Sequence, residues 1–267
     1  GELILAVAMT EPGAGSDLAG MKTTAVDKGD HYELNGSKVF ISNGILADVV
    51  IVAAKTDPAS KHAMGLFLVE RGMPGFERGT PLKKLGMKSQ DTAELFFNNV
   101  KVPKENLLPK KSGLGAPLGC LDSARYGIAW GVIGAAMDCY DTALRYAKER
   151  SQFGKPIAAT QLQQKKLAEM LTEITKAQLL AFRLGQLKNQ GKATTAQISM
   201  AKRNNVDMAI KIAREARQVL GGMGITGEYS IMRHMMNLES VITYEGTHDI
   251  HLLITGADIT GHPAFSS

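Results

Sequence analysis

The sequence predicts an α+β fold in which a small antiparallel β-barrel or sandwich is followed by a four-helix bundle. Short apolar runs separated by turn residues fill residues 1–110, a pattern that is typical of strands in a small β-domain. Residues 111–267 instead carry apolar side chains at the three- and four-residue spacing of helices. A chain of 267 residues, 44% of them apolar, is long enough for two such domains, and we place their boundary between residues 110 and 111.

The first domain shows its strands as apolar runs and its turns as asparagine and glycine. Residues 3–9, 49–53 and 66–69 are predicted to be strands. The dipeptides Asn-Gly at 35–36 and Asn-Asn at 98–99 each separate two shorter runs. Because asparagine and glycine tolerate positive φ, both dipeptides are expected to be turns between paired strands.

The second domain is marked by three apolar stripes that each predict a long helix. The stripes run over residues 128–146, 167–177 and 198–219. Gly191 separates the second helix from the third, and Asn205 is the polar residue that breaks the third stripe. Gly221 and Gly222 end the third helix. Thr247 is a good N-cap for a fourth.

Composition and charge argue against several classes of function. The net charge of +5 and the pI of about 9.1 are mildly basic, but the charges are scattered and 6% aromatic residues are too few for a nucleic-acid-binding surface. Cys120 and Cys139 form neither a disulfide framework nor a metal-binding pattern, and both are expected to be small buried residues. No apolar run reaches membrane-spanning length, and no targeting peptide is visible in a chain whose first residues resemble the middle of a protein.

A single carboxylate stands beside a flexible glycine just ahead of the predicted fourth helix. Glu245 precedes Gly246 in the string TYEGTHDIH at residues 243–251. An apolar cleft around this turn would raise the pKa of the carboxylate and make it a useful general base. Considered alone, an acidic turn residue is more often a solvated surface residue than a general base, so the rest of the chain decides between these two roles.

Five further motifs carry residue types suited to a large cofactor, its phosphates or a substrate. A glycine-rich loop, MTEPGAGSD, occupies residues 9–17, and its free backbone N–H groups let a flat ring or a phosphate approach closely. An arginine with glutamines at a helix end suits a pyrophosphate. The other motifs are KVFISNG at 38–44, LDSARYG at 121–127, RSQFGKPI at 150–157 with Gln161 beyond it, and QVLGGMG at 218–224.

Taken together, these motifs resemble the acyl-CoA dehydrogenase family, and the string at 243–251 is most similar to the glutaryl-CoA dehydrogenases within it. The resemblance covers essentially the whole chain and implies the family's middle and C-terminal domains, without its N-terminal helical domain. From about Gly113 onward the sequence resembles glutaryl-CoA dehydrogenases, whereas before about Leu108 it is more similar to general or long-chain members. A divergent member and a mosaic with a junction between Pro109 and Gly115 both fit this difference.

The resemblance implies that FAD is the cofactor. The residues implied to bind it are Met9, Thr10, Ser16, Phe40, Ile41, Ser42, Arg150, Gln152, Phe153, Gln161, Gln218, Leu220, Gly221, Gly222 and Thr247. On this resemblance Met9 and Thr10 lie against the flavin ring, and Phe40 and Ser42 stand where the family often has tryptophan and threonine. The segment around Gly221 resembles the one that binds the flavin of a neighbouring subunit, which implies a homo-oligomer, expected to be a tetramer.

The resemblance also assigns the substrate side of the site. Glu245 is the implied catalytic base. Some family members carry the base at the position of Ala124, which here cannot take a proton. In the family the backbone N–H of the base binds the thioester oxygen, and no metal is implied. The residues implied to bind acyl-CoA are Ser16, Leu121, Asp122, Arg125, Tyr126 and Gly246.

The implied function is FAD-dependent α,β-dehydrogenation of an acyl-CoA thioester, with electrons passed to electron-transferring flavoprotein. Glutaryl-CoA, oxidised and decarboxylated to crotonyl-CoA, is the best-matched substrate. The alternatives are a straight-chain acyl-CoA, a flavoprotein oxidase on the same fold, or a catalytically silent fragment that acts as a binding or assembly module. The family implies the mitochondrial matrix or the bacterial cytoplasm, and neither a nucleic-acid partner nor a membrane span is expected.

Overall fold

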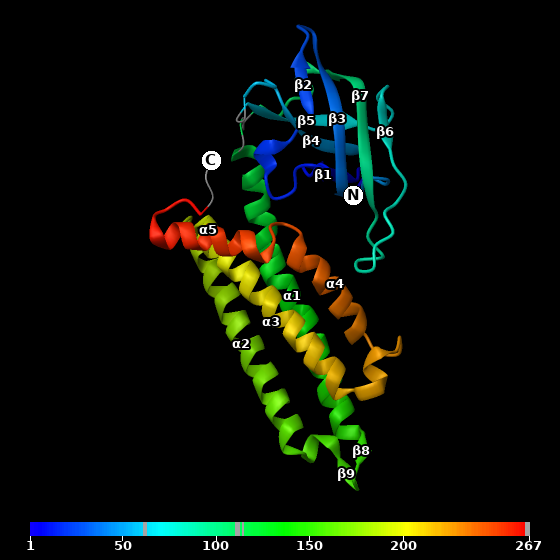
Figure 1. The fold of residues 1–267 in the computed structure, drawn as a ribbon, viewed down its shortest axis with the longest axis vertical. Coiled ribbons are helices and arrows are strands. Elements are labelled where there is room, and N and C mark those ends of the chain that lie inside the picture. The colour runs from blue at the N-terminus through cyan, green and yellow to red at the C-terminus, as the bar shows by residue number, and fades with distance from the viewer. Residues whose placement is uncertain (61–62, 110–112, 114, 265–267) are drawn as a thin grey trace. The chain divides into compact units, whose positions relative to one another are not determined.

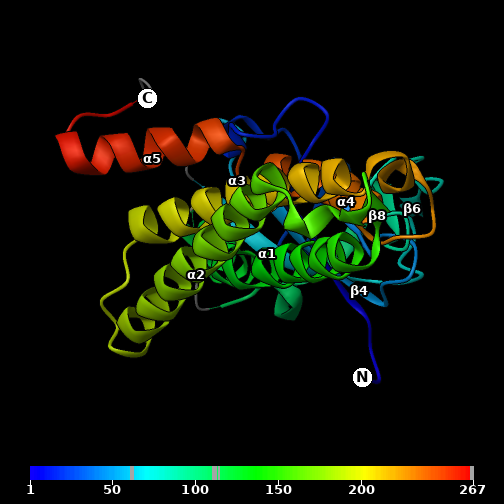
Figure 2. The same cartoon turned by 90° about the horizontal axis from the view of Figure 1, so that it is seen from below.

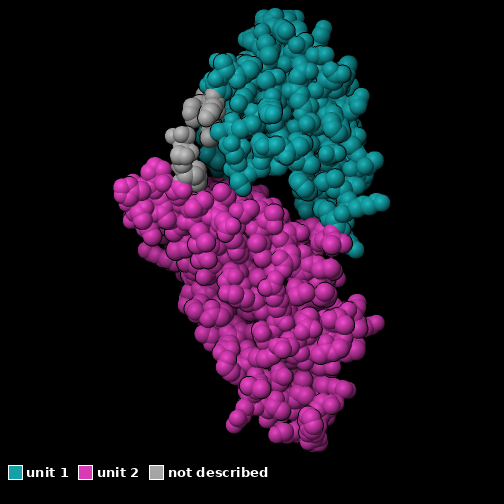
Figure 3. All heavy atoms as spheres, in the orientation of Figure 1, with its two compact units in different colours: residues 1–84, 88–121 teal, residues 85–87, 122–267 magenta. Residues whose placement is uncertain are grey.

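The computed structural model describes residues 1–60, 63–109, 113 and 115–264 (Figure 1). The chain divides into two compact units (Figure 3). Unit 1 comprises Gly1–Lys84 and Lys88–Leu121, and unit 2 comprises Leu85–Met87 and Asp122–Ser267. The boundary predicted between residues 110 and 111 falls on residues outside the described ranges and stays a prediction, and the choice between a divergent member and a mosaic with a junction between Pro109 and Gly115 stays open.

Unit 1 is built on one mixed seven-stranded sheet. Its strands are β1 (Leu5–Ala8), β2 (Thr24–Asp27), β3 (His31–Ser42), β4 (Val49–Lys55), β5 (Met64–Glu70), β6 (Phe76–Arg78) and β7 (Thr92–Pro103). They pair in the order β1-β4-β2-β3-β7-β6, and β5 also pairs with β4. Most pairs are antiparallel as predicted, but β1 and β2 both run parallel to β4. Buried side chains from β1 to β5 and from β7 form the core of this unit.

The two dipeptides expected to be turns are β-bulges instead. Strands β3 and β7 run unbroken through them, and the β3–β7 register shifts between Leu34 and Gly36. Asn99 has a φ of +50°, and its N–H donates to Oδ1 of Asn35 over 2.9 Å. The prediction was wrong because residues that tolerate positive φ suit a bulge inside a long strand pair as well as a turn between two short strands. The turn between β2 and β3 lies at Gly29, whose φ is +99°.

Unit 2 is helical, so the predicted order of a β-domain followed by a helical domain is confirmed. The helices are α1 (Gly115–Glu149), α2 (Gln161–Asn189), α3 (Thr195–Val219), α4 (Ile231–Thr243) and α5 (His248–Thr260). Helices α1, α2 and α3 lie side by side in both views (Figures 1 and 2). The described chain thus has five α-helices, whereas the three stripes and the cap at Thr247 predict four. Helix α4 escapes the pattern because it has only 13 residues, and three of them are buried.

Polar side chains help to join the helices of unit 2. Asn205, which interrupts the stripe of α3, is fully buried. Its Nδ2 donates to the carbonyl of Ala129 on α1 over 2.9 Å and to that of Ala177 on α2 over 3.3 Å. The polar residue therefore connects three helices, and its amide group is satisfied as a buried polar group must be.

Two further expectations meet the structure here. Cys139 is buried, as predicted, whereas Cys120 is exposed on the first turns of α1, contrary to the prediction. A cysteine's small apolar side chain does not by itself show whether the residue is buried, because one side of a long helix faces solvent. In the part of the chain that the structure describes, none of the helices carries an apolar stretch that would reach across a lipid bilayer.

Candidate active site

The turn that carries Glu245 joins α4 to α5 (Figure 1, orange to red). Glu245 has a φ of +58° and Gly246 a φ of +92°, so two successive residues adopt left-handed backbone conformations. Thr247 then caps α5 as predicted, and its Oγ1 accepts a hydrogen bond of 3.2 Å from the N–H of Ile250. A non-glycine residue in the left-handed region costs about 1–3 kcal/mol, and it persists only where its surroundings hold it.

Arg125 of α1 holds this turn by its main chain. The side chain is 5% exposed, and its Nε donates to the carbonyl oxygen of Glu245 over 2.8 Å. Its Nη1 lies 3.3 Å from Oδ1 of Asp122, whose Oδ2 accepts a 2.6 Å hydrogen bond from Thr195 at the start of α3. The structure therefore brings together Glu245, Arg125 and Asp122, three of the residues singled out from the sequence.

Lys202 of α3 is a site residue that the sequence reasoning missed. It is fully buried, and its Nζ donates to the carbonyl oxygens of Val241, Tyr244 and Gly246, each over 2.9 Å. Burial, assisted by the charge of Arg125, lowers the pKa of Lys202 to about 8. The signal in the sequence was a charged residue one position after Ala201 in the apolar stripe, where a core residue is expected.

The carboxyl group of Glu245 is the group in this site that is poised to take a proton. Burial raises its pKa, although the charges of Arg125 and Lys202 act in the opposite direction. Its Oε2 is buried and makes no hydrogen bond to any described residue. A carboxylate that is desolvated, without a partner for one oxygen and next to buried cations has the features of a general base.

His251 of α5 closes the other side of the turn. The ring is fully buried, and burial beside Lys202 and Arg125 lowers the pKa of His251 to about 3, so the imidazole is neutral at physiological pH. A Cβ on Gly246 would lie 2.9 Å from Cε1 of this ring. Only glycine therefore fits at position 246, both for its φ and for its space.

Two other residues expected to bind substrate make different contacts. Tyr126 packs against the cluster formed by Leu184 and Ile198, and the ammonium of Lys188 on α2 lies 5.0 Å from its ring centroid. Leu121 packs in a core cluster of unit 1. The assignment of both residues to substrate binding stays a prediction.

The glycine-rich loop of unit 1 is anchored by a buried ion pair. Lys38 is fully buried and Glu11 is 6% exposed, and Nζ of Lys38 lies 2.9 Å from both Oε1 of Glu11 and the carbonyl of Met9. Glu11 also accepts hydrogen bonds from the N–H groups of Lys22 and Thr23, at 2.6 and 3.0 Å. Burial alone would raise the pKa of Glu11, but these bonds and the Lys38 charge lower it, so the carboxylate stays ionised.

The loop and the end of β3 present the first group of predicted cofactor residues. The N–H of Val39 donates to the carbonyl of Thr10 over 2.9 Å. Phe40 follows with a φ of +59° and an exposed fraction of 65%, an uncommon conformation for a bulky residue that is typical of functional sites. Ser42 is exposed and accepts a hydrogen bond from Gln90, whereas Ile41 lies in the core and offers a ligand its main chain alone. Ser16 is exposed in the same loop, and Met9 is buried.

The second group of predicted cofactor residues lies at the ends of the helices of unit 2. A short hairpin, β8 (Ser151–Gln152) with β9 (Lys155–Pro156), joins α1 to α2, and Phe153 at its tip has a φ of +53° and is 99% exposed. Leu220 is buried, but its neighbour Gly221 is exposed with a φ of +58°. The remaining members of this group are all exposed, namely Arg150, Gln152, Gln161, Gln218 and Gly222.

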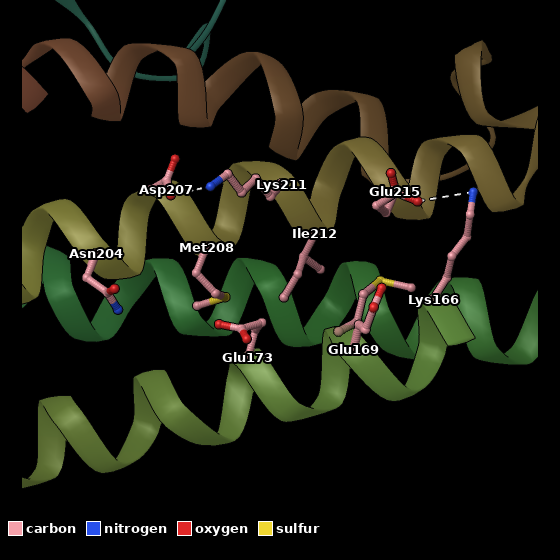
Figure 4. Close-up of a pocket in the computed structure, with 10 residues that line it drawn as sticks. Lys166, Glu169, Glu173, Asn204, Asp207, Met208, Lys211, Ile212 and Glu215 are labelled. Carbon is pink, nitrogen blue, oxygen red and sulfur yellow. Dashed lines mark hydrogen bonds and ion pairs between the residues drawn. The ribbon is translucent and has the colours of Figure 1, made fainter. Parts of the chain in front are cut away.

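A groove between α2 and α3 has a volume of about 380 Å³ (Figure 4), and its lining residue Lys166 donates a hydrogen bond to Oε1 of Gln218. Charged side chains line much of it. Lys211 pairs with Asp207 over 2.7 Å, and Lys166 pairs with Glu215 over 3.1 Å. None of the residues predicted from the sequence lines this groove, and its charged walls are already paired.

Comparison with known proteins matches both parts of the chain to one family. Residues 6–100 match the acyl-CoA dehydrogenase middle domain, and residues 111–260 match the acyl-CoA dehydrogenase C-terminal domain. The short-chain specific acyl-CoA dehydrogenase of Megasphaera elsdenii is 40% identical over 94% of this chain, and this chain covers 66% of that protein.

Two solved structures are similar throughout the chain. A glutaryl-CoA dehydrogenase of Mycobacterium smegmatis superimposes with a TM-score of 0.96 and 48% identity, over 99% of this chain and 67% of that one. A glutaryl-CoA dehydrogenase of the same organism in complex with FADH2 has the same TM-score at 46% identity, over 99% of this chain and 68% of that one. The chain thus spans about two thirds of the length of the proteins it matches.

Proposed function

This chain belongs to the acyl-CoA dehydrogenase family, and on that premise we propose that it forms the flavin-binding and base-bearing part of an enzyme that oxidises an acyl-CoA thioester between its α- and β-carbons. The observation that carries the proposal is the half-buried Glu245 side chain, whose Oε2 is buried. One of its oxygens has no partner among the described residues, while its turn is fixed by Arg125 and Lys202.

We infer that FAD is the cofactor, because the glycine-rich loop and Phe40 fit a flat ring. A Cβ built on Gly13 or Gly15 meets nothing within 4 Å, so the loop leaves open space beside its main chain. The exposed Phe40 is fixed to this loop through the hydrogen bond between Val39 and Thr10. When bound, the flavin supplies the acceptor for the hydride that leaves the β-carbon of the substrate.

In the proposed reaction the ionised Glu245 takes the proton from the α-carbon. The electron pair of that C–H bond becomes the new α,β double bond as the hydride leaves the β-carbon. A carboxylate in water is too weak a base for this proton. Burial raises the pKa of Glu245 and so strengthens it as a base. The cations of Arg125 and Lys202 lower the same pKa, which favours the ionised carboxylate.

The backbone N–H of Glu245 is a suitable donor for the thioester oxygen. Within the described residues no group accepts a hydrogen bond from it. The bond from Arg125 to the adjoining carbonyl fixes the direction of the turn. Negative charge develops on the thioester oxygen as the α-proton leaves, and one preorganised donor lowers such a barrier by about 3 kcal/mol.

We propose glutaryl-CoA as the substrate, since the similar structures of 46 to 48% identity are glutaryl-CoA dehydrogenases. This substrate also loses its distal carboxylate as CO2, and a proton takes its place to give crotonyl-CoA. A straight-chain acyl-CoA is the second candidate, favoured by the 40% identity to the short-chain enzyme of M. elsdenii.

The remaining expectations concern partners and compartment. We propose that the electrons pass to electron-transferring flavoprotein and that the protein is a homo-oligomer, a tetramer. The exposed Phe153 and the exposed Gly221 segment support this, since both are available to a flavin held by a second subunit. The bacterial relatives favour the bacterial cytoplasm over the mitochondrial matrix.

The test is an anaerobic titration of the FAD-loaded protein with glutaryl-CoA and with a series of straight-chain acyl-CoA thioesters. The proposal predicts that glutaryl-CoA bleaches the flavin absorbance and releases CO2. Bleaching only by the straight-chain monocarboxyl thioesters would support the proposed dehydrogenation but refute glutaryl-CoA as the substrate. A yellow protein that no thioester bleaches would overturn the catalytic proposal in favour of a binding or assembly module.

A further inference from the structure

The turn that carries Glu245 is held almost entirely through its carbonyl groups. Four carbonyl oxygens from residues 241–246 accept hydrogen bonds from two buried cations of other helices. Arg125 takes the carbonyl of Glu245 itself, and Lys202 takes those of Val241, Tyr244 and Gly246. An ammonium has three N–H donors and no acceptor, so Lys202 is fully satisfied by the main chain and leaves none of its donors for a substrate.

We propose that Lys202 is the positioning residue of the base, fixing the turn of residues 244–246 so that the Glu245 carboxylate keeps one reactive orientation. The inference rests on the proposed function, because it assigns a role to a residue that binds the main chain on both sides of the base, at Tyr244 and Gly246, and not the reacting atoms. Arg125 holds one carbonyl of the turn, whereas Lys202 connects the end of α4 to the residue that follows the base.

The position of Lys202 relative to α4 explains why a cation is needed. Helix α4 ends at Thr243, and the last carbonyls of a helix have no partners within it. The carbonyl of Val241 belongs to this last turn, and that of Tyr244 to the C-cap. A cation at a helix C-terminus satisfies these carbonyls and complements the negative end of the helix dipole. The same ammonium also binds the carbonyl of Gly246, so one group joins the helix end to the left-handed turn.

Lys202 also sets part of the charge that the carboxylate experiences. The cations of Arg125 and Lys202 lower the pKa of Glu245 against the effect of burial. Removing the lysine charge should therefore move that pKa upward. The ionisable groups that surround the turn are Asp122 and Arg125 from α1, Lys202 from α3, Tyr244 on the turn, and His248 and His251 from α5.

The test compares Lys202→Met with the wild-type protein, both loaded with FAD, in single-turnover reduction of the flavin by the acyl-CoA that bleaches it. Lys211→Met is the matched control, because Lys211 lies on the same helix but is 69% exposed in an ion pair with Asp207. A displacement of about 1 Å at a reacting group costs roughly a hundredfold in rate. We expect Lys202→Met to keep its FAD and its affinity for acyl-CoA, to reduce the flavin about a hundredfold more slowly, and to shift the midpoint of the rate against pH upward. Lys211→Met should match the wild type.

Two results would overturn the assignment. One is a folded Lys202→Met protein whose rate and pH midpoint equal those of the wild type. The other is a less stable protein whose folded fraction turns over at the full rate with the same midpoint, since this is the behaviour of a merely structural residue. If Lys202→Met does not fold, Lys202→Gln keeps two N–H donors without the charge and should show the same upward shift, and an unshifted midpoint overturns the assignment. Glu245→Gln in the same assay separates the two proposals: reduction at the normal rate would refute the proposed function, whereas an inactive Glu245→Gln beside a normal Lys202→Met would refute the role of Lys202 alone.

Discussion

Replacing Lys38 by methionine tests whether the buried ion pair with Glu11 holds the glycine-rich loop of unit 1. Lys38 is fully buried and Glu11 is 6% exposed, so the change leaves a carboxylate in the core without its cation. Breaking a buried pair in this way costs about 3–5 kcal/mol. The N–H groups of Lys22 and Thr23 still bind Glu11, which places the expected loss near the lower end, at about 3 kcal/mol.

Native-state hydrogen exchange measures this loss in unit 1 alone. The amides of β3 exchange through opening of the sheet, and about 3 kcal/mol corresponds to exchange roughly a hundredfold faster or more. The matched control is Lys28→Met, because Lys28 pairs with Glu33 over 3.3 Å with side chains that are 44% and 29% exposed. An exposed pair contributes less than about 1 kcal/mol, so exchange in the control should change only a few-fold.

The same variant carries a functional readout and a rescue. The lysine also binds the carbonyl of Met9, so Lys38→Met should lose FAD more readily than the control does. Adding Glu11→Gln removes the unpaired charge and should restore part of the lost stability. The reasoning fails if Lys38→Met exchanges no faster than Lys28→Met, or if the double variant is less stable than Lys38→Met.

Three further predictions concern unit 2. Gly246→Ala forces an alanine into a φ of +92° with its Cβ 2.9 Å from the ring of His251, and should cost about 2–4 kcal/mol in urea unfolding followed by tryptophan fluorescence; an unchanged midpoint would contradict the packing described for the turn. Asn205→Leu removes the donor that serves two buried carbonyls and should cost about 1–3 kcal/mol in the same measurement, whereas a more stable variant would show that the carbonyls need no donor. Because burial raises the pKa of Glu245 and the base acts ionised, the rate of flavin reduction should fall as the pH is lowered through a midpoint above the ordinary glutamate value of about 4.3; a midpoint at or below that value would contradict the burial of the base.

The sequence predicts the helices of this fold better than its sheet. Long apolar stripes locate α1, α2 and α3 because the spacing of three and four residues persists over many turns. The dipeptides at 35–36 and 98–99 led to a wrong prediction of turns. Tolerance of positive φ is a property of a single residue, whereas a turn and a bulge differ in whether the chain reverses or continues along its partner strand. Parallel pairing of β1 and β2 with β4 likewise depends on chain paths that no local pattern records.

The site divides in the same way between local and distant information. The turn with Glu245 and its cap Thr247 lie within one motif at residues 243–251, and Arg125 lies within another at residues 121–127, so each is visible in the sequence. Lys202 contacts residues about forty positions away, and Lys38 contacts Glu11 across 27 positions, so the partners of both cations appear only in the fold. A buried lysine breaks an apolar pattern, and this irregularity is the one sign of such a pair that a single sequence offers.

The central claim, that Glu245 removes the α-proton, is tested most directly by single-turnover flavin reduction in Glu245→Gln. The control is Glu239→Gln, since Glu239 is 52% exposed in an ion pair with Arg214 on the surface. The account predicts that Glu245→Gln keeps its FAD and still binds acyl-CoA but reduces the flavin at least roughly a hundredfold more slowly, while the control keeps the wild-type rate. Reduction of Glu245→Gln at the wild-type rate would contradict the account and assign the proton to another group.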